Sequence, residues 1–334
     1  MSEKHFHTFS FVHLSVISAS LNASLRGQKV MNITVKVPAT SANLGPGFDS
    51  LGLALDLWNE AEFIPTNDKK ISLTIEGEGR EKLPTGASNA IVDAALQVYN
   101  LAGKPYHGMQ IHCLNRVPLS SGLGSSSAAL LTGMLGANAI LGEPFSREEI
   151  LKLAIETEGH PDNVAPAMLG GLVASIIHER HVLSLRITLT DHRTPIHITV
   201  VFPDFDFPTQ QARAILPKQI ELQDAIHNIS RAVIVTEAFR LGNLDMLNEA
   251  MEDRLHQPYR IPLIPGAQAA MDAAKRAGAS AVALSGAGPS LIAFSSQADP
   301  AIGEAMKRAF EGAGLQARIF QLKMSDHGAE VQIG

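Results

Sequence analysis

The segment that most constrains the fold is a loop of small residues and hydroxyls that leads into an apolar stretch. Residues 117–129 read VPLSSGLGSSSAA, and no proline follows up to Leu141. Gly122 and Gly124 allow tight turns and a close approach of the backbone to a ligand. We expect a helix to begin at about Ser126, so that its unpaired N–H groups and the positive end of its dipole face the loop. The sequence therefore predicts a phosphate-binding site here.

Two better-known glycine loops do not fit this segment. A P-loop carries a lysine directly after its second glycine, and residues 117–129 contain no lysine. A dinucleotide-binding loop has a third glycine three residues after Gly124, where this chain has Ser127. A structural alternative stays open, because small residues also let a helix pack closely against a neighbour.

Two further segments join the loop in a recognisable order. Residues 38–49 read PATSANLGPGFD, and residues 285–290 read SGAGPS. Between them, the pattern P-x-x-x-G-L-G-S-S-x-A begins at Pro118. The three together resemble the motifs of the GHMP small-molecule kinases, a superfamily that includes galactokinase, homoserine kinase and mevalonate kinase. The resemblance runs from about Met31 to the end of the chain.

The amino-acid composition indicates which class of molecule the protein binds. With 334 residues, of which 45% are hydrophobic and 18% charged, the chain is globular and long enough for two domains. A net charge of −6 with scattered Lys and Arg argues against nucleic acid. A single cysteine, Cys113, fits a reducing cytoplasm, and no apolar run of 18 residues suggests a membrane span. We expect a cytoplasmic protein that binds small molecules.

Hydrophobic periodicity predicts an α+β protein with mixed helices and strands. The expected strands are 33–37 (ended by Pro38), 51–57, 60–64, 71–75, 109–114, 169–177, 197–202, 280–284 and 290–294, and the expected helices are 89–101, 126–141, 150–158, 223–241, 244–251, 267–277 and 300–311. Ser146 and Glu149 form a capping box before the helix at 150–158. The polar stretch 179–193 predicts a domain boundary near residue 190. Residues 1–30 are expected to be an unstructured, dispensable extension or the product of a misassigned start codon.

A second chemically dense segment lies at residues 156–166, which read ETEGHPDNVAP. One histidine without cysteine disfavours zinc, whereas carboxylate oxygens suit Mg²⁺. The alternative is a solvated helix end. The sequence HPDNVAP, from His160 to Pro166, is similar to homoserine kinases in particular.

The resemblance implies a fold and an activity. The fold would be the two-domain GHMP kinase architecture, with residues 31–190 as a nucleotide-binding domain similar to the second domain of ribosomal protein S5. Residues 191–334 would form a ferredoxin-like C-terminal domain. The implied reaction is the ATP- and Mg²⁺-dependent phosphorylation of the L-homoserine hydroxyl to O-phospho-L-homoserine, in threonine biosynthesis. A homodimer is compatible with this resemblance.

The resemblance also implies residue roles. The ATP contacts would be Pro118, Leu119, Ser120, Ser121, Gly122, Leu123, Gly124, Ser125, Ser126, Ser127 and Ala128. The homoserine contacts would be Asn43, Asp49, His160, Thr209, Arg213 and Arg260. Asn163, His160 and Asp162 would be catalytic. Ser126 and Glu156 would bind Mg²⁺, with Glu158 as the alternative to Glu156.

The chemistry of an amino-acid substrate agrees with this set. Its ammonium group needs a carboxylate, a role that suits Asp49, and its carboxylate needs guanidinium groups, a role that suits Arg213 and Arg260. An amide cannot accept a proton, so Asn163 would orient the hydroxyl while His160 binds nearby. Two alternatives stay open: a GHMP kinase for a mevalonate-pathway or sugar substrate, and a nucleotide-binding regulator without turnover.

Overall fold

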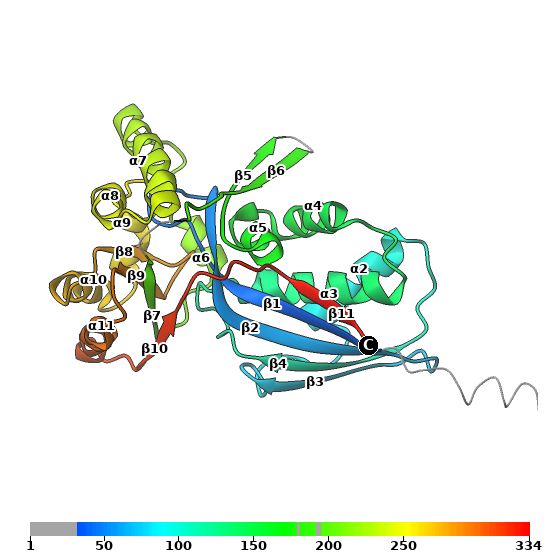
Figure 1. Cartoon of the computed structure of the whole chain (residues 1–334). Helices are drawn as coiled ribbons and strands as arrows, with labels where there is room; N and C mark the ends of the chain where they lie inside the picture. Colours follow the sequence, from blue (N-terminus) through cyan, green and yellow to red (C-terminus); the bar gives the residue numbers. More distant parts are fainter. Residues whose placement is uncertain (1–31, 179–180, 192–194) are drawn as a thin grey trace, which may run out of the picture.

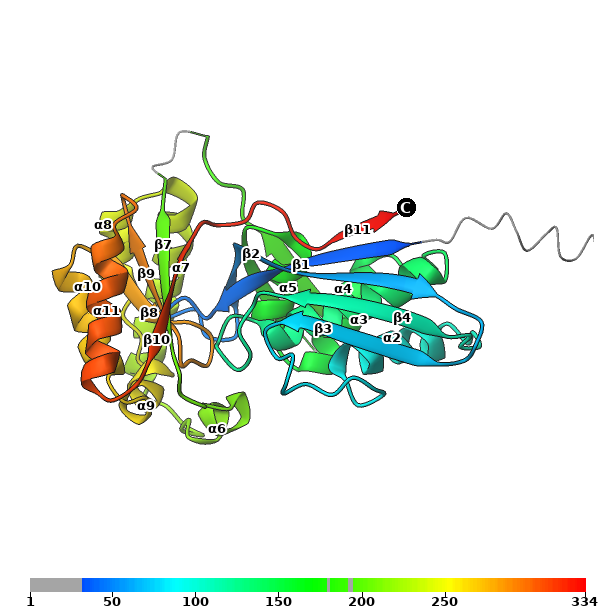
Figure 2. The ribbon, with the colours of Figure 1, turned by 90° about the horizontal axis from the view of Figure 1, so that it is seen from below.

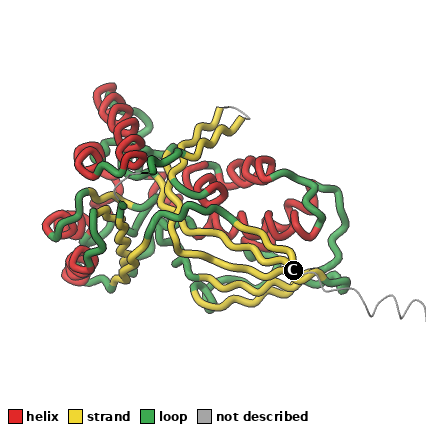
Figure 3. Tube along the Cα trace, viewed as in Figure 1, coloured by secondary structure: helices red, strands yellow, loops and turns green. Residues whose placement is uncertain are grey.

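The computed structural model describes residues 32–178, 181–191 and 195–334. The extension predicted at residues 1–30 lies outside the described residues. The described chain forms two groups of helices and strands that lie side by side, each built on its own sheet (Figures 1 and 3). The predicted α+β class is therefore confirmed. Within these residues no helix is both long and apolar enough to cross a membrane.

The first group is a seven-stranded sheet, as far as the chain is described, with four helices on one face (Figure 2). Its strands are β1 (Ile33–Ala42), β2 (Leu51–Pro65), β3 (Ile71–Gly77), β4 (Met109–Asn115), β5 (Leu172–His178), β6 (His181–Arg186) and β11 (Glu330–Ile333). Its helices are α2 (Ala90–Leu101), α3 (Ser125–Ile140), α4 (Arg147–Glu158) and α5 (Pro161–Leu169). The order is β11-β1-β2-β4-β3, and β5 pairs with β2 and β6.

Burial explains how α3 fits against this sheet. In β1 the side chains of Ile33, Val35 and Val37 are completely buried and alternate with partly exposed neighbours, as one covered face requires. On α3, Gly136 leaves room for Phe63 of β2, because a Cβ there would lie 2.5 Å from the Phe63 ring. The sheet thereby holds α3, the helix that directly follows the glycine loop.

Several strand predictions in this sheet are wrong in their bounds. The predicted strand 169–177 begins at the last residue of α5, whereas β5 begins at Leu172. Pro38 does not end β1, which continues to Ala42 through a register shift between Pro38 and Ala39. The predicted strands 51–57 and 60–64 form the single strand β2, which bends at the same irregularity. A bulge tolerates proline because the ladder is interrupted there and its missing N–H is not needed.

The second group is an antiparallel sheet with helices on both faces. Its strands, in the order β10-β7-β9-β8, are β7 (His197–Pro203), β8 (Ala281–Leu284), β9 (Leu291–Ser295) and β10 (Ala317–Leu322). One face packs on α7 (Leu222–Leu241) and α8 (Leu244–Ala250), and the other on α10 (Ala267–Arg276) and α11 (Pro300–Gly312). The short helices α6 (Thr209–Ala214) and α9 (Gln257–Arg260) lie at its edge. Neighbouring strand residues such as Val200 and Val201 face opposite cores.

The two groups are joined by a shared core and by the end of the chain. Leu44, Leu53 and Leu123 pack in the same hydrophobic cluster as Phe239 and Phe294 of the second group. The predicted boundary near residue 190 falls between β6 and β7. Within the range 191–334, β11 returns to the first sheet and pairs antiparallel with β1.

Candidate active site

The glycine loop has a fixed conformation at the start of α3. Gly124 takes the left-handed conformation, with φ of 70°, and α3 begins at Ser125, one residue before the predicted start. The Ser121 hydroxyl donates to the Pro118 carbonyl at 2.8 Å, and the Leu123 N–H donates to that hydroxyl at 3.3 Å. The loop is thus held by its own side chain, and the positive end of the α3 dipole faces the space above it.

The three glycine-containing motifs meet at this loop. Ser285 Oγ donates to the Gly122 carbonyl at 2.7 Å, and the Gly286 N–H donates to the Ala42 carbonyl at 3.1 Å. Asn43 Nδ2 donates to the Gly286 carbonyl at 2.8 Å. Gly122 must be glycine here, because a Cβ would collide with the backbone oxygen of Ser285. Three segments far apart in the sequence therefore form one wall.

A cavity of about 170 Å³ opens over this wall. The predicted site residues that line it are Asn43, Ser120, Ser121, Gly122, Gly124, Ser125, Ser126, Ser127, His160, Asp162, Asn163, Thr209, Arg213 and Arg260. Four predicted loop residues do not line it: Leu123 and Ala128 are fully buried in the cores, Pro118 is buried below the loop, and Leu119 lines a neighbouring cavity.

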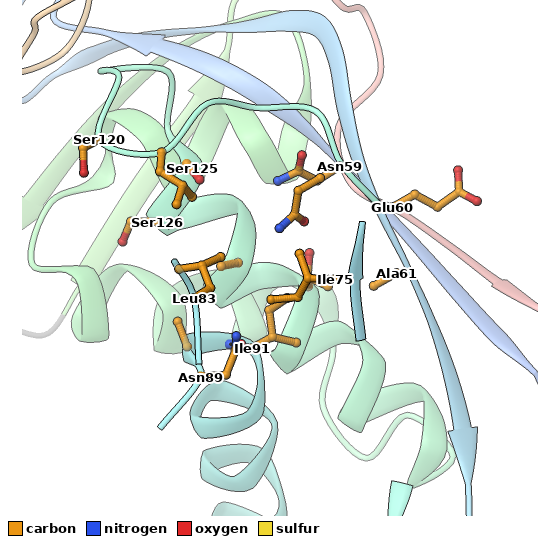
Figure 4. A pocket seen from close by; sticks show the side chains of 15 residues that line it. Asn59, Glu60, Ala61, Ile75, Leu83, Asn89, Ile91, Ser120, Ser125 and Ser126 are labelled. Atoms are coloured by element: carbon orange, nitrogen blue, oxygen red, sulfur yellow. The ribbon is translucent and has the colours of Figure 1, made fainter. Parts of the chain in front are cut away.

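The neighbouring cavity, of about 270 Å³, continues from the same loop between β2, α2 and α3 (Figure 4). Ser120, Ser125 and Ser126 border both cavities. Its other walls are mostly apolar or amide side chains, among them Asn59, Ile75, Leu83, Asn89, Ile91 and Asn115. Asn59 Oδ1 accepts the Arg116 and Val117 N–H groups at 2.8 and 3.0 Å, which fixes that wall. This cavity could not be predicted from the sequence, since the pattern of its apolar residues is the same as that of core residues.

The acidic group beside the loop is Glu158 and not Glu156. Ser126 Oγ and Ser127 Oγ donate to the two Glu158 carboxylate oxygens at 3.0 and 3.1 Å. The Glu156 side chain is 53% exposed and lies 3.9 Å from Lys152 in a helix-surface ion pair. Of the two glutamates expected as metal ligands, Glu158 therefore faces the loop and Glu156 does not, because residues two apart on a helix face different directions.

The start of α5 carries three further polar residues of this segment, His160, Asp162 and Asn163. His160 is its N-cap residue, and its Nδ1 lies 3.1 Å from Asp162 Oδ1. Burial of the ring lowers the pKa of His160, but the hydrogen bond and the charge of Asp162 outweigh it, so the pKa lies above its ordinary 6.5. Asn163 Oδ1 accepts the Thr40 hydroxyl at 2.8 Å, so the amide presents its N–H groups elsewhere. Asn163 can thus donate into the cavity that it lines.

The groups predicted to bind opposite ends of an amino acid pair with one another. Arg213 donates to both oxygens of Asp49, at 3.0 and 2.6 Å, in a two-point ion pair. Asn43 Oδ1 accepts the Asp49 N–H at 3.0 Å. Thr209 lies one helical turn before Arg213 and lines the same cavity.

Arg260 is more deeply placed than the sequence indicated. It is 1% exposed, and burial lowers its pKa to about 10. Its Nε donates to the Ala212 carbonyl at 3.0 Å, and Nη1 lies 3.3 Å from both the Gly286 carbonyl and His256 Nδ1. The Phe48 ring lies over Arg213 and Arg260 and stacks on His256. Sequence reasoning missed Phe48 and His256, although Phe48 lies inside the first motif.

This combination of fold and site is that of a GHMP kinase. The profile described as "GHMP kinases N terminal domain" matches residues 89–171, and "GHMP kinases C terminal" matches residues 235–312. The chain is a kinase of this superfamily, and the predicted two-domain GHMP fold is confirmed.

Its curated relatives identify the branch. The chain is 45% identical over 298 residues to the homoserine kinase of Moorella thermoacetica, covering 89% of this chain and 99% of that protein. It is 40% identical to the homoserine kinase of Carboxydothermus hydrogenoformans, over 89% of this chain and 96% of that one. The crystal structure of a Cytophaga hutchinsonii homoserine kinase superposes with a TM-score of 0.81 at 30% identity, over 92% and 98% of the two chains. The chain belongs to the homoserine kinases.

Proposed function

We propose that the protein transfers the γ-phosphoryl group of ATP to the side-chain hydroxyl of L-homoserine, forming O-phospho-L-homoserine for threonine biosynthesis. The observation that carries the proposal is that one cavity joins the glycine loop at the α3 N-terminus to Arg213, which pairs with Asp49 at the edge of the cavity lining. A phosphate site and an amino-acid site thus lie within reach of each other. Buried Cys113 and small-molecule substrates fit an enzyme of the cytoplasm.

ATP would occupy both cavities. The base would enter the mostly apolar 270 Å³ cavity, where Asn59, Asn89 and Asn115 offer amide groups (Figure 4). The phosphates would then lie along Ser120 to Ser126, which border both cavities, with the backbone N–H groups and the helix dipole of α3 facing their charge.

Mg²⁺ would be held by Ser126 and Glu158. In the described residues no three His, Cys, Asp or Glu side chains lie close enough to hold a metal alone. A hydroxyl and one carboxylate are nevertheless the hard oxygen ligands with which Mg²⁺ is bound beside nucleotide phosphates. When bound, the ion would neutralise charge on the β- and γ-phosphates. Ser126 Oγ, Ser127 Oγ and Glu158 already share hydrogen bonds at that position.

Homoserine fits the charges at the other end of the cavity. The Asp49 carboxylate and the Asn43 amide would take its ammonium group, and Arg213 and Arg260 would take its carboxylate, with Thr209 and His160 beside it. A zwitterionic amino acid brings one charge for each partner of the Asp49–Arg213 pair. Mevalonate offers only a carboxylate, and a sugar offers neither charge, so the pair favours homoserine over both.

Asn163 would direct the reaction without removing the proton. Its amide oxygen is occupied by Thr40, so its N–H groups would donate to the homoserine hydroxyl oxygen and hold it in line with the γ-phosphate. Phosphoryl transfer has a loose transition state, so positioning and charge neutralisation suffice and a strong base is not required. Asp162 is 2% exposed and bonded to His160, which suits orientation of His160.

The test is ADP release measured with homoserine, mevalonate, galactose and no acceptor. The proposal requires that ADP release be fast with homoserine and slow with mevalonate, with galactose and without an acceptor. Preference for mevalonate or galactose would identify another GHMP kinase, and ATP binding without acceptor-dependent release would identify a regulator. Mass spectrometry should detect one added phosphoryl group on homoserine.

A further inference from the structure

His256 is a fully buried histidine that contacts Arg260, one of the two arginines proposed to bind the homoserine carboxylate. It is the residue directly before α9. Its Nε2 lies 2.8 Å from the Gly45 carbonyl oxygen and 3.5 Å from Asp253 Oδ2, and its Nδ1 lies 3.3 Å from Arg260 Nη1. In the described structure His256 does not itself border the cavity. Any effect of this ring on a substrate must therefore act through a neighbouring residue.

The partners of the two ring nitrogens determine the protonation state of His256. Nε2 faces the Gly45 carbonyl and the Asp253 carboxylate, which are acceptors, so Nε2 carries a proton. Nδ1 faces an Arg260 nitrogen, which can only donate, so Nδ1 is unprotonated and accepts. A proton on Nδ1 would place two cationic groups in contact inside the protein. Burial lowers the pKa of His256 below its ordinary 6.5, although the Asp253 charge opposes the shift, which agrees with a neutral ring.

The neutral ring restricts the orientation of the Arg260 guanidinium group. Arg260 Nε donates to the Ala212 carbonyl at 3.0 Å, and Nη1 is shared between the Gly286 carbonyl and His256 Nδ1, each at 3.3 Å. Both bonds to Nη1 are longer than the usual ~2.9 Å, so the two acceptors hold this nitrogen jointly. Because the group is planar, fixing two of its nitrogens fixes the direction of the third, Nη2. Nη2 is then left for a carboxylate in the cavity that Arg260 lines.

The imidazole ring is itself held in place. Asp253, whose side chain is completely buried, accepts the His256 and Gln257 N–H groups at 3.0 and 2.6 Å. Asn228 Nδ2 donates to the same carboxylate at 2.7 Å. The Phe48 ring stacks on the imidazole, with the ring centroids 5.2 Å apart. The backbone and the plane of the imidazole are both constrained, so Nδ1 is an acceptor at a fixed position.

We infer that His256 is a positioning residue for the acceptor substrate. As the neutral tautomer with the proton on Nε2, it holds the Arg260 guanidinium in the orientation that receives the substrate carboxylate. This inference rests on the proposed function of the cavity, because the carboxylate is that of homoserine. It adds to the proposed substrate contacts a residue that touches no substrate and yet contributes to the selection of an amino acid.

NMR of a chain with ¹⁵N-labelled histidine tests the tautomer without any substrate, and therefore independently of the proposed function. The His256 signals are assigned by their loss in the variant His256→Leu. Near neutral pH they should show a protonated Nε2 and an unprotonated Nδ1. A protonated Nδ1 would overturn the inference, because this nitrogen could then not accept a hydrogen bond from Arg260.

Kinetics with an acceptor that lacks the carboxylate test the positioning role. The measured quantity is kcat/KM for homoserine divided by kcat/KM for aminopropanol, which is homoserine without its carboxylate. His256→Leu keeps an apolar side chain beside Phe48 but removes the acceptor, so it should lower this ratio by roughly 10-fold without changing KM for ATP. His256→Asn places an amide oxygen near the position of Nδ1 and should restore most of the ratio. A purely structural role would lower both kcat/KM values equally.

His227→Leu is the matched control, since the His227 side chain is also largely buried, at 8% exposed, but lies on α7 away from the cavity lining. It should leave the ratio unchanged. If His256→Leu does not fold, His256→Gln carries the test, because its amide can reach the Gly45 carbonyl but leaves no acceptor at the Nδ1 position.

Two results of the kinetic test would count against the inference, and they differ from each other. An unchanged ratio in the folded His256 variant, with a wild type that uses homoserine, would overturn the positioning role alone. A wild type that releases no ADP with homoserine would overturn the proposed function and, with it, the role of His256 toward a carboxylate.

Discussion

Thr40 and Asn163 are 123 positions apart in the sequence, yet the Thr40 hydroxyl donates to the Asn163 amide oxygen at 2.8 Å. The Thr40 N–H also donates to the Leu123 carbonyl at 3.1 Å. One fully buried residue of β1 therefore fixes both the glycine loop and the amide that faces the cavity. Because this bond occupies the amide oxygen, Asn163 has its N–H groups left to donate into the cavity that it lines.

Replacing Thr40 by valine should reduce kcat more than substrate affinity. Valine keeps the shape but loses the hydroxyl, so the Asn163 amide is free to turn its oxygen toward the homoserine hydroxyl. Loss of one hydrogen bond of about 1–1.5 kcal/mol predicts a roughly 5- to 15-fold lower kcat. Steady-state kinetics at saturating ATP would measure it. Thr40→Ser keeps the donor and should restore most of the rate; equal losses in serine and valine would show that the methyl group, not the bond, matters.

Glu158 and Glu156 should respond differently to neutralisation. Glu158→Gln should raise the Mg²⁺ concentration for half-maximal rate by at least ~10-fold and lower kcat, because even indirect contacts to a metal contribute ~10- to 100-fold. Glu156→Gln should stay within about twofold of wild type, since an exposed helix-surface ion pair contributes little. The measurement is the rate of each variant as a function of Mg²⁺ concentration. A larger effect at Glu156 would contradict the proposed metal role of Glu158.

The sequence predicted regular elements with strong local signals. The capping box of Ser146 and Glu149 is present, and α3 begins within one residue of its predicted start. In contrast, no separate helix was predicted at α5, because Gly159 ends α4 and Pro161 starts α5 only two residues later. β6 lies in a polar stretch, and β11 is four residues long and depends on pairing with β1. Such short strands are determined by distant partners rather than by local pattern.

The site was predictable as a set of motifs and not as a set of contacts. Motif order indicated that the loops at Asn43, Gly122 and Gly286 belong together, and they meet in the structure. Which of two glutamates faces the loop depends on how α4 is rotated, and only packing sets that rotation. The Asp49–Arg213 pair likewise joins residues 164 positions apart, which no local pattern could connect.

Replacement of Arg213 by glutamine should reduce activity alone, whereas replacement of Arg260 should reduce both activity and thermal stability. Arg213→Gln should lower kcat/KM for homoserine by roughly 10- to 150-fold with little change in melting temperature, because its pair with Asp49 is about one-third exposed. Arg260→Gln should also lower the melting temperature, since its buried guanidinium bonds to Ala212 and Gly286 are lost. Kinetics and thermal unfolding of both variants separate the roles. Lost ATP affinity with unchanged homoserine affinity in Arg213→Gln would contradict this division of the cavity.

The His160–Asp162 pair should make stability depend on pH. The pKa of His160 is raised in the folded protein, so its contribution to the free energy of unfolding is fully present below the unfolded value near 6.5 and is lost as pH rises through the folded value. The stability difference between wild type and His160→Gln should therefore be larger at pH 5.5 than at pH 8.5. Urea unfolding at both pH values measures it. A difference that grows with pH would mean that burial outweighs the Asp162 charge.

Gly124 offers the sharpest test of the phosphate loop, because the chain contains a matched control. Gly124 and Gly142 both have positive φ, 70° and 78°, so alanine at either position carries a similar backbone strain of about 1 kcal/mol. A Cβ at Gly124 would also collide with Thr40 Oγ1 and lie 3.2 Å from Asn163 Oδ1, whereas at Gly142 it would meet nothing within 4 Å.

The two substitutions should therefore differ in function rather than in backbone strain. Gly142→Ala should cost stability and leave ATP affinity and kcat unchanged. Gly124→Ala should show the same strain and, in addition, lower kcat by at least ~10-fold, since displacing Thr40 breaks the bond that orients Asn163. Gly124→Val should weaken nucleotide binding further, because its branched side chain enters the space above the loop. Calorimetric ATP titration of the folded variants is the measurement. Unchanged ATP affinity in Gly124→Val, or equal kinetic losses in the two alanine variants, would remove the loop from the phosphate site.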